Sequence, residues 1–288
     1  MQHADSFRAM DTGIDVIAES AAPFPPFGLF AGIHLLFEQQ EERFSRFRPG
    51  SLLSRLNAGE TIEDPFFAAA CRLALEAHAF TGGLFNPLIL GALRQAGYGV
   101  TFGSVSGGEP RPTHVPSPAE CLAVEGTRVS LHGAQLDLGG IVKGWTVDLA
   151  AEMAANAGFA ALVNAGGDLR ATGTEDGAAN GWFVQVDGPT GEPAWEGEVA
   201  GGLATSTTLR RAWRTSDGGR AHHLIDPRTG LPADSPFVQV SAWARETWRA
   251  ECWAKAVLVG GHAAARAARA AGVPVLAITP AGAVLVAP

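Results

Sequence analysis

Hydrophobic residues recur along the first part of the chain at the spacing of amphipathic helices. Within 28–48 they fall at positions 29, 33, 36, 37, 44 and 47, so one helical face is apolar and the polar middle, EQQEER, is expected to face water. A second helix is expected over 64–80, because Asp64 can cap its start and Pro65 suits its first turn. These two segments indicate a substantial helical layer.

The second half of the chain predicts both strands and helices. A helix is expected over 141–157 with a left-handed cap at Gly158, followed by a buried strand, FAALVN. GWFVQVDGP alternates as a half-buried strand, two helices are expected over 246–261 and 262–272, and the chain closes with a hairpin. We therefore predict an α+β fold, a mixed sheet with helices packed around a largely antiparallel core.

Composition narrows the class of protein. A net charge of −8 and a pI near 5.5 argue against a nucleic-acid partner, and no apolar stretch is long enough to span a membrane or act as a secretory leader. Cys71, Cys121 and Cys252 are far apart and are expected to be reduced thiols of a cytoplasmic protein. Only the Gly/Pro/Ser-rich stretch 98–120 resembles a boundary, so a single domain over 1–288 is expected.

The segment LDLGGIVKGW, 136–145, has the make-up of an anion site. A strand is expected to end in two glycines and open into a helix, whose backbone N–H groups and partial positive charge would face an anion beside Lys143. The segment is neither a Walker A loop nor a GxGxxG dinucleotide motif. Local chemistry alone leaves open a tight turn followed by a solvated lysine.

Other segments stand in order around this turn: FRAMDTG, RFRPGSLLSRLNAG, TGGLFNP, ALVNAGGDLRATG, GGLATSTT, HHLIDPRTGLP and AECWAKAVLVGG. Together with LDLGGIVKGW they resemble the FAD:protein FMN transferases, the ApbE family. The resemblance implies that a Thr or Ser hydroxyl of an acceptor protein attacks FAD, accepts FMN and releases AMP. An FAD pyrophosphatase and a flavin-binding protein without transferase activity remain alternatives.

The resemblance also implies a flavin site, with departures from the family pattern at Asn86, in AMDTG and at Phe47, where aspartate, AMGT and tyrosine are usual. Met10 and Phe47 could equally be core residues, and Asp137 and Asp168 could be turn formers. The implied flavin-binding residues are Met10, Phe47, Leu84, Phe85, Asn86, Asp137, Lys143, Asp168, Leu224 and Lys255.

The segment HHLIDPRTG has a structural and a catalytic interpretation. Asp226 and Pro227 favour a type I turn over 226–230. The resemblance places His223 near the reacting phosphate, as acid/base or hydrogen-bond donor, with Asp226 as its catalytic companion.

The resemblance implies a Mg²⁺ site, which this chain alters. Family members carry A-D-x-x-x-T, and here Glu251 replaces the aspartate and Lys255 the threonine, while Gly140 retains a carbonyl. A protonated lysine cannot ligate a metal. Glu251 and Lys255 are therefore either an ion pair on a helix surface or a site where the ammonium takes the place of the cation.

Overall fold

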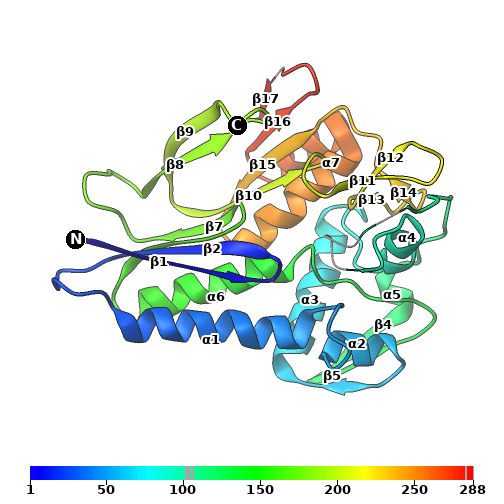
Figure 1. Ribbon diagram of the computed structural model, residues 1–288, viewed down its shortest axis with the longest axis horizontal. Coiled ribbons are helices and arrows are strands. Elements are labelled where there is room, and N and C mark those ends of the chain that lie inside the picture. Colours follow the sequence, from blue (N-terminus) through cyan, green and yellow to red (C-terminus); the bar gives the residue numbers. More distant parts are fainter. Residues whose placement is uncertain (101–104, 106, 283, 288) are drawn as a thin grey trace.

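The protein is built on one eight-stranded sheet (Figure 1). The structure, a computed structural model, describes residues 1–100, 105, 107–282 and 284–287. The strand order is β1-β2-β6-β7-β10-β15-β16-β17, and every strand pairing within the described residues is antiparallel. These strands are β1 (Gln2–Ala9), β2 (Thr12–Glu19), β6 (Ala160–Ala165), β7 (Asp168–Thr172), β10 (Gly201–Thr207), β15 (Gln239–Ala244), β16 (Val275–Ile278) and β17 (Val284–Ala287).

Three long helices cover one face of this sheet. In Figure 1, α6 (Val142–Asn156) and α7 (Thr247–Ala270) lie against the strands, and α1 (Phe27–Phe44) packs on α6 from outside. Their apolar faces form two clusters with the sheet, one among α1, α6, β2 and β6 and one between α7 and β15–β16. The opposite face is covered by the hairpin β8 (Trp182–Asp187) and β9 (Pro193–Val199), whose Trp182 is buried against Leu169 and Leu203.

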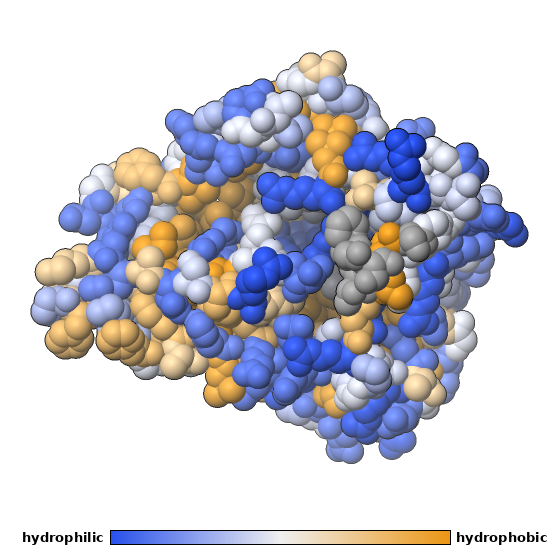
Figure 2. All heavy atoms as spheres, in the orientation of Figure 1, coloured by the Kyte–Doolittle hydropathy of each residue, from blue (hydrophilic) through white to orange (hydrophobic). Residues whose placement is uncertain are grey.

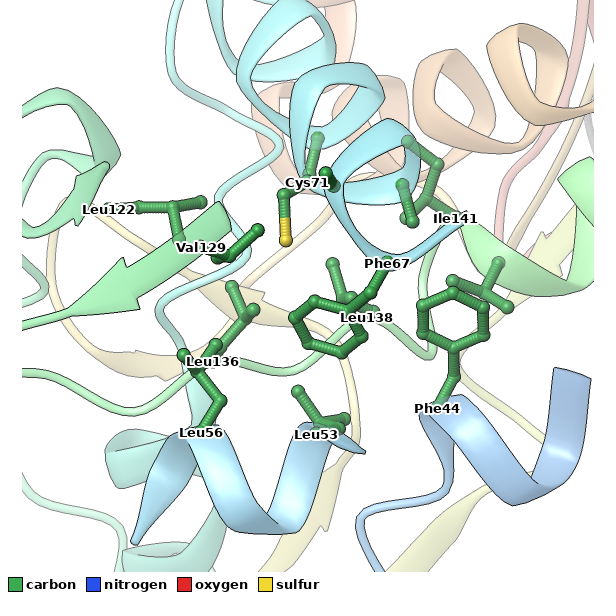
Figure 3. Close-up of a cluster of buried hydrophobic side chains, with 14 of the residues drawn as sticks. Phe44, Leu53, Leu56, Phe67, Cys71, Leu122, Val129, Leu136, Leu138 and Ile141 are labelled. Atoms are coloured by element: carbon green, nitrogen blue, oxygen red, sulfur yellow. The ribbon is translucent and has the colours of Figure 1, made fainter. Parts of the chain in front are cut away.

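A smaller layer of helices and short strands packs around the apolar cluster drawn in Figure 3. Leu136, Leu138 and Ile141, from the segment that leads into α6, point into this cluster beside Phe67 and Cys71. The elements of this part are α2 (Leu52–Asn57), β3 (Ile62–Glu63), α3 (Pro65–Phe80), α4 (Leu90–Gln95), α5 (Pro118–Cys121), β4 (Leu122–Glu125) and β5 (Arg128–Leu131). Two hairpins follow β10, namely β11 (Ala212–Arg214) with β12 (Arg220–His222), and β13 (Ile225–Asp226) with β14 (Leu231–Pro232).

The predicted elements agree well with these bounds. Asp64 accepts a hydrogen bond from Phe67 N at 2.7 Å and caps α3, and Gly158 follows α6 with φ of 85°. The two helices expected near the C-terminus form α7, which is kinked at Gly261. The α+β class and the antiparallel core are confirmed, but the described pairings contain no parallel component, so the expected mixed character is not found there.

Two local expectations were wrong. The polar middle of α1 does not all face water, because Gln40 is fully buried. The helix ends at Phe44, before Phe47, since Ser45 has extended backbone angles. In the stretch 98–120, positions 101–104 and 106 lie outside the described residues, and the single-domain expectation stays a prediction.

All three cysteines are free, and Cys71 and Cys252 are buried, although Cys121 is partly exposed. Burial raises the pKa of the Cys71 thiol to about 12, so this thiol stays protonated. Among the residues that the structure describes, no helix has the length and apolar character needed to cross a membrane.

A buried carboxylate from α6 holds the start of α7. Asp148 accepts hydrogen bonds from the backbone N–H groups of Thr247 at 2.8 Å and Trp248 at 3.0 Å. The residue at the N-cap position of α7, Glu246, makes no such bond with its own side chain. The first turn of α7 therefore receives its cap from another helix, which also fixes the distance between the two helices.

We expect Asp148→Ala to lower the free energy of unfolding by about 2 to 4 kcal/mol, because two buried N–H groups lose their acceptor. Urea denaturation followed by circular dichroism measures this loss. The matched control is Asp64→Ala, which removes the more exposed cap of α3 and should cost about 1 kcal/mol. A loss for Asp148→Ala no greater than that of the control would contradict the cap's role in joining α6 to α7.

Candidate functional site

The segment before α6 forms no strand, which corrects the strand predicted to end in LDLGG. Individual groups, not a neighbouring strand, satisfy its backbone hydrogen bonds. The Asn57 side-chain amide accepts from Leu136 N at 2.7 Å and donates to Leu136 O at 2.8 Å, and Asp137 N donates to Pro87 O at 2.8 Å. Leu136 and Leu138 are buried, which leaves Asp137 and Gly139 on the outer side. The glycine turn is thus held by a core and a side-chain amide instead of a sheet.

Asp137 shapes this turn. Its Oδ1 accepts from Gly139 N at 2.7 Å, and its Oδ2 lies 3.0 Å from Arg46 Nε. Arg46 also donates to Tyr98 O at 2.8 Å. The sequence interpretation missed Arg46, because one arginine among many carries no signal of its partner.

Four charged side chains from three elements meet at the start of α6. Lys143 Nζ donates to Asp168 Oδ2 and, at 2.9 Å, to Ala165 O, while Lys255 Nζ donates to Glu251 Oε1 at 2.8 Å. Asp168 and Glu251 are buried, and their side chains are 3% and 1% exposed. The two lysine side chains are 19% and 17% exposed, so both remain accessible to a ligand. We call Lys143, Asp168, Glu251 and Lys255 the charge cluster.

Two alternatives from the sequence are decided here. Glu251 and Lys255 are not a helix-surface pair, because the carboxylate is buried and its Oε2 accepts from Gly144 N in α6 at 2.9 Å. Asp168 does not bond the β6–β7 turn; Gly167 N donates to Asn164 Oδ1 instead. Both carboxylates belong to the charge cluster.

Burial and mutual attraction set the ionisation of this cluster. Burial opposes charge on both Glu251 and Lys255, but their attraction outweighs it, so the pKa of Glu251 is lowered and that of Lys255 is raised. Burial raises the pKa of Asp168 to about 6, against the attraction of Lys143. Glu251 and Lys255 are therefore both charged at neutral pH.

The geometry does not fit the expected Mg²⁺ site. Both oxygens of Glu251 are occupied, one by Lys255 and one by Gly144 N. A Cβ built on Gly140 would lie 3.4 Å from Lys255 Cε, so the lysine side chain runs beside this glycine. Within the described part of the chain, no three His, Cys, Asp or Glu residues gather as metal ligands.

His223 and Asp226 differ in how free their polar atoms are. His223 Nδ1 is buried with no hydrogen-bond partner among the described residues, and burial, together with Arg211 and Lys255, holds the pKa of this ring well below its usual value. Asp226 Oδ1 and Oδ2 both accept from the Arg228 side chain. Asp226 O accepts from Thr229 N at 3.2 Å and from Gly230 N at 2.8 Å, so the chain turns over 226–230 as predicted, with an i to i+4 bond beside the i to i+3 bond expected of a type I turn. His223 Nδ1 is therefore free to form a further hydrogen bond, whereas both carboxylate oxygens of Asp226 already accept hydrogen bonds within its turn.

The remaining predicted residues lie in structural contacts. Met10 occupies the β1–β2 turn with φ of 51°, and its N donates to Glu41 Oε2 at 3.0 Å. Phe47 packs on Tyr98 with ring centroids 6.1 Å apart, and Asn86 bonds Pro116 O and Leu88 N. Among the others, Phe85 packs on Gly140, Leu84 joins the core beneath α7, and Leu224 is buried in that core.

A glycine allows α6 and α7 to approach this closely. A Cβ on Gly144 would lie 2.9 Å from Glu251 Oε2 and 3.0 Å from the Trp248 backbone.

Figure 2 shows that the face of the molecule drawn there is hollowed beside the main sheet. The chain therefore combines an α+β scaffold with a helix N-terminus, a glycine turn and two accessible lysines, the features of a protein that binds a phosphorylated ligand.

Comparison with known proteins identifies the family. The chain belongs to the ApbE family, whose profile matches residues 10–277. It is 30% identical over 271 residues to an FAD:protein FMN transferase of Vibrio cholerae, covering 85% of this chain and 78% of the relative. A Treponema pallidum protein of the same name is 28% identical over 255 residues, covering 80% and 70%.

Solved structures share the fold. The crystal structure of the ApbE protein from Thermotoga maritima superposes with a TM-score of 0.89 at 23% identity, covering 100% of this chain and 97% of that one. The flavin transferase ApbE from Vibrio cholerae gives 0.80 at 24% identity, with the same coverage. The resemblance inferred from the sequence motifs is confirmed.

We expect Gly144→Ala to destabilise the protein by about 1 to 3 kcal/mol, because the added methyl group forces α6 away from Glu251 and Trp248. In an open helix the same change stabilises by about 0.5 to 1 kcal/mol. Gly91→Ala in α4 is the matched control, since nothing lies within 4 Å of a Cβ there. Thermal melts of both variants check this, and equal shifts would show that the close helix contact tolerates a methyl group.

Proposed function

We propose that this protein is an FAD:protein FMN transferase, which moves FMN from FAD to a Thr or Ser hydroxyl of an acceptor protein and releases AMP. The observation that carries this proposal is the charge cluster, in which the two lysines of the chain meet at the N-terminus of α6. Membership of the ApbE family supports it, and the curated relatives bear this name.

In this proposal the charge cluster binds the pyrophosphate of FAD. Each ammonium has three donors, of which the described contacts use two on Lys143 and one on Lys255. Donors therefore remain on both lysines, and the first N–H groups of α6 add partial positive charge beside Gly139 and Gly140. The flavin itself would contact the residues around Met10, Phe47, Phe85 and Asp137.

The reaction needs a positioned hydroxyl and neutralised phosphate charge more than covalent help. The acceptor oxygen attacks the phosphorus on the FMN side, the bond from that phosphorus to the AMP oxygen breaks, and the hydroxyl proton passes to a base. We assign the base to His223, because its Nδ1 has no hydrogen-bond partner among the described residues and its lowered pKa keeps the ring unprotonated at pH 7. Asp226 holds the turn that follows His223.

We also propose that the ammonium of Lys255 stands where relatives with the usual threonine would bind Mg²⁺. Its pairing with Glu251 and its course along Gly140 support this assignment. A covalently attached cation supplies positive charge but no open coordination position.

The three free cysteines suit a reducing compartment, so we place the chain in the cytoplasm.

The direct test incubates the purified protein with FAD and a Thr-containing acceptor protein, with and without EDTA. Mass spectrometry of the acceptor should show the added mass of FMN, with free AMP in equal amount. AMP and free FMN without modified acceptor would indicate a pyrophosphatase. FAD binding without either product would indicate a binding protein.

We expect His223→Ala to slow transfer at least about 100-fold while the Kd for FAD stays within about threefold of wild type. His222→Ala is the matched control, because that neighbouring ring already bonds Ala233 O at 3.1 Å. Single-turnover rates of AMP release separate the chemical step from binding. Full activity of His223→Ala would remove the base assignment.

We expect wild-type transfer to be insensitive to EDTA, because the cation is Lys255 itself. Lys255→Thr should make activity depend on added Mg²⁺, since it returns an oxygen ligand beside Glu251 and Gly140. The measurement is the transfer rate against Mg²⁺ concentration for both proteins. Loss of wild-type activity on chelation, restored by Mg²⁺, would mean that a metal binds despite the lysine.

A further inference from the structure

The β11–β12 hairpin carries positive charge that the protein does not neutralise. Arg210, Arg214 and Arg220 are exposed, and within the described residues none of them forms an ion pair. The hairpin's one carboxylate, Asp217, accepts from Thr215 Oγ1 and Gly219 N and so closes the turn. The hairpin is therefore positively charged, although the chain as a whole has a net charge of −8.

Two of these arginines oppose one another in the ribbon. Arg214 and Arg220 are direct partners in the antiparallel register of β11 and β12. Like charges at such positions destabilise a two-stranded ribbon. The placement of Arg214 opposite Arg220 therefore does not stabilise the fold, and it points instead to a bound partner of negative charge.

The hairpin is nevertheless held firmly. Between the arginines, Trp213 is buried, donates from Nε1 to Ala96 O at 2.8 Å and packs on Tyr98 with ring centroids 5.6 Å apart. Ala221, on the opposite strand, is fully buried in the same cluster. Alternate residues thus fix the ribbon to the body and present the arginines to solvent.

The base of the hairpin adjoins the proposed catalytic histidine. His223 follows β12 directly, and its N donates to Arg211 O at 3.2 Å. Arg211 reaches across to Asp11 in the β1–β2 turn, at 3.7 Å. Figure 2 shows strongly hydrophilic side chains over this hairpin, beside the hollow in the same face.

We propose that the β11–β12 hairpin is the docking surface for the acceptor protein, and that it recognises an acidic segment flanking the modified hydroxyl. This inference rests on the proposed function, which requires a protein to reach His223. The charge cluster already supplies cations for the FAD phosphates, and the hairpin arginines point to solvent instead. Their charge complements carboxylates and would steer an acidic partner toward the site.

The test measures binding of two fluorescent peptides to the FAD-loaded protein by anisotropy at low salt. One is a 15-residue peptide with a central threonine and six Asp or Glu residues, and the other replaces those with Asn or Gln. The acidic peptide should bind at least about tenfold more tightly, and this preference should fall steeply with salt. Equal affinities would overturn the proposal.

The doubly substituted R214Q/R220Q protein should lose the preference, whereas Arg266→Gln, an exposed arginine of α7, should keep it. The melting temperature of R214Q/R220Q should be unchanged or higher than that of wild type, because the double substitution removes a like-charged pair. The Kd for FAD should stay within about twofold, since both arginine side chains are exposed and charges in solvent are screened. A weakened FAD Kd with an unchanged peptide preference would assign the hairpin to the nucleotide and overturn the docking role.

These outcomes are separate from those of the transferase test. Modified acceptor and released AMP with no acidic preference would leave the proposed function intact and reject the docking surface. Hairpin-dependent peptide binding without modified acceptor would reject the transferase and leave an acidic-partner surface. Each result therefore decides one proposal.

Discussion

The structure depends on two helices that cap one another with buried carboxylates. Asp148 of α6 accepts from the first N–H groups of α7, and Glu251 of α7 accepts from Gly144 N in the first turn of α6. Neither helix forms a cap with its own N-cap side chain. Because buried N–H groups without acceptors are costly, each helix start is stable only where the other is present.

This reciprocal arrangement also builds the charge cluster. Glu251 can reach α6 only because Gly144 has no side chain, and the same contact brings Lys255 along the glycine turn. Lys143, one residue before Gly144, then meets Asp168 at the start of β7. A buried carboxylate without a cation would be unfavourable by several kcal/mol, so the two lysines serve stability as well as ligand binding.

Much of the fold could be predicted from the sequence because local signals agreed with it. Asp64 and Pro65 marked the start of α3, Gly158 marked the end of α6, and the alternation around Trp182 matched the burial of β8. The signals failed where a distant group decided the outcome. LDLGG has the alternation of a strand, yet the Asn57 amide and Pro87 carbonyl satisfy its backbone, and Gln40 is polar but buried.

For the site, the sequence by itself determined which chemical groups are present and that their order matches the ApbE family. It could not determine how those groups pair, because a lysine four residues after a glutamate on a helix has the same local geometry on a surface and in a core. Tertiary structure decided that Glu251 is buried, that both its oxygens are occupied and that Asp226 is bound to Arg228 while His223 is not bonded through Nδ1. The physical reason is that burial comes from elements that are distant in the sequence, as where Gly144 N, 107 positions from Glu251, occupies one of its oxygens. Burial and hydrogen-bond partners together set both the charge and the availability of each group.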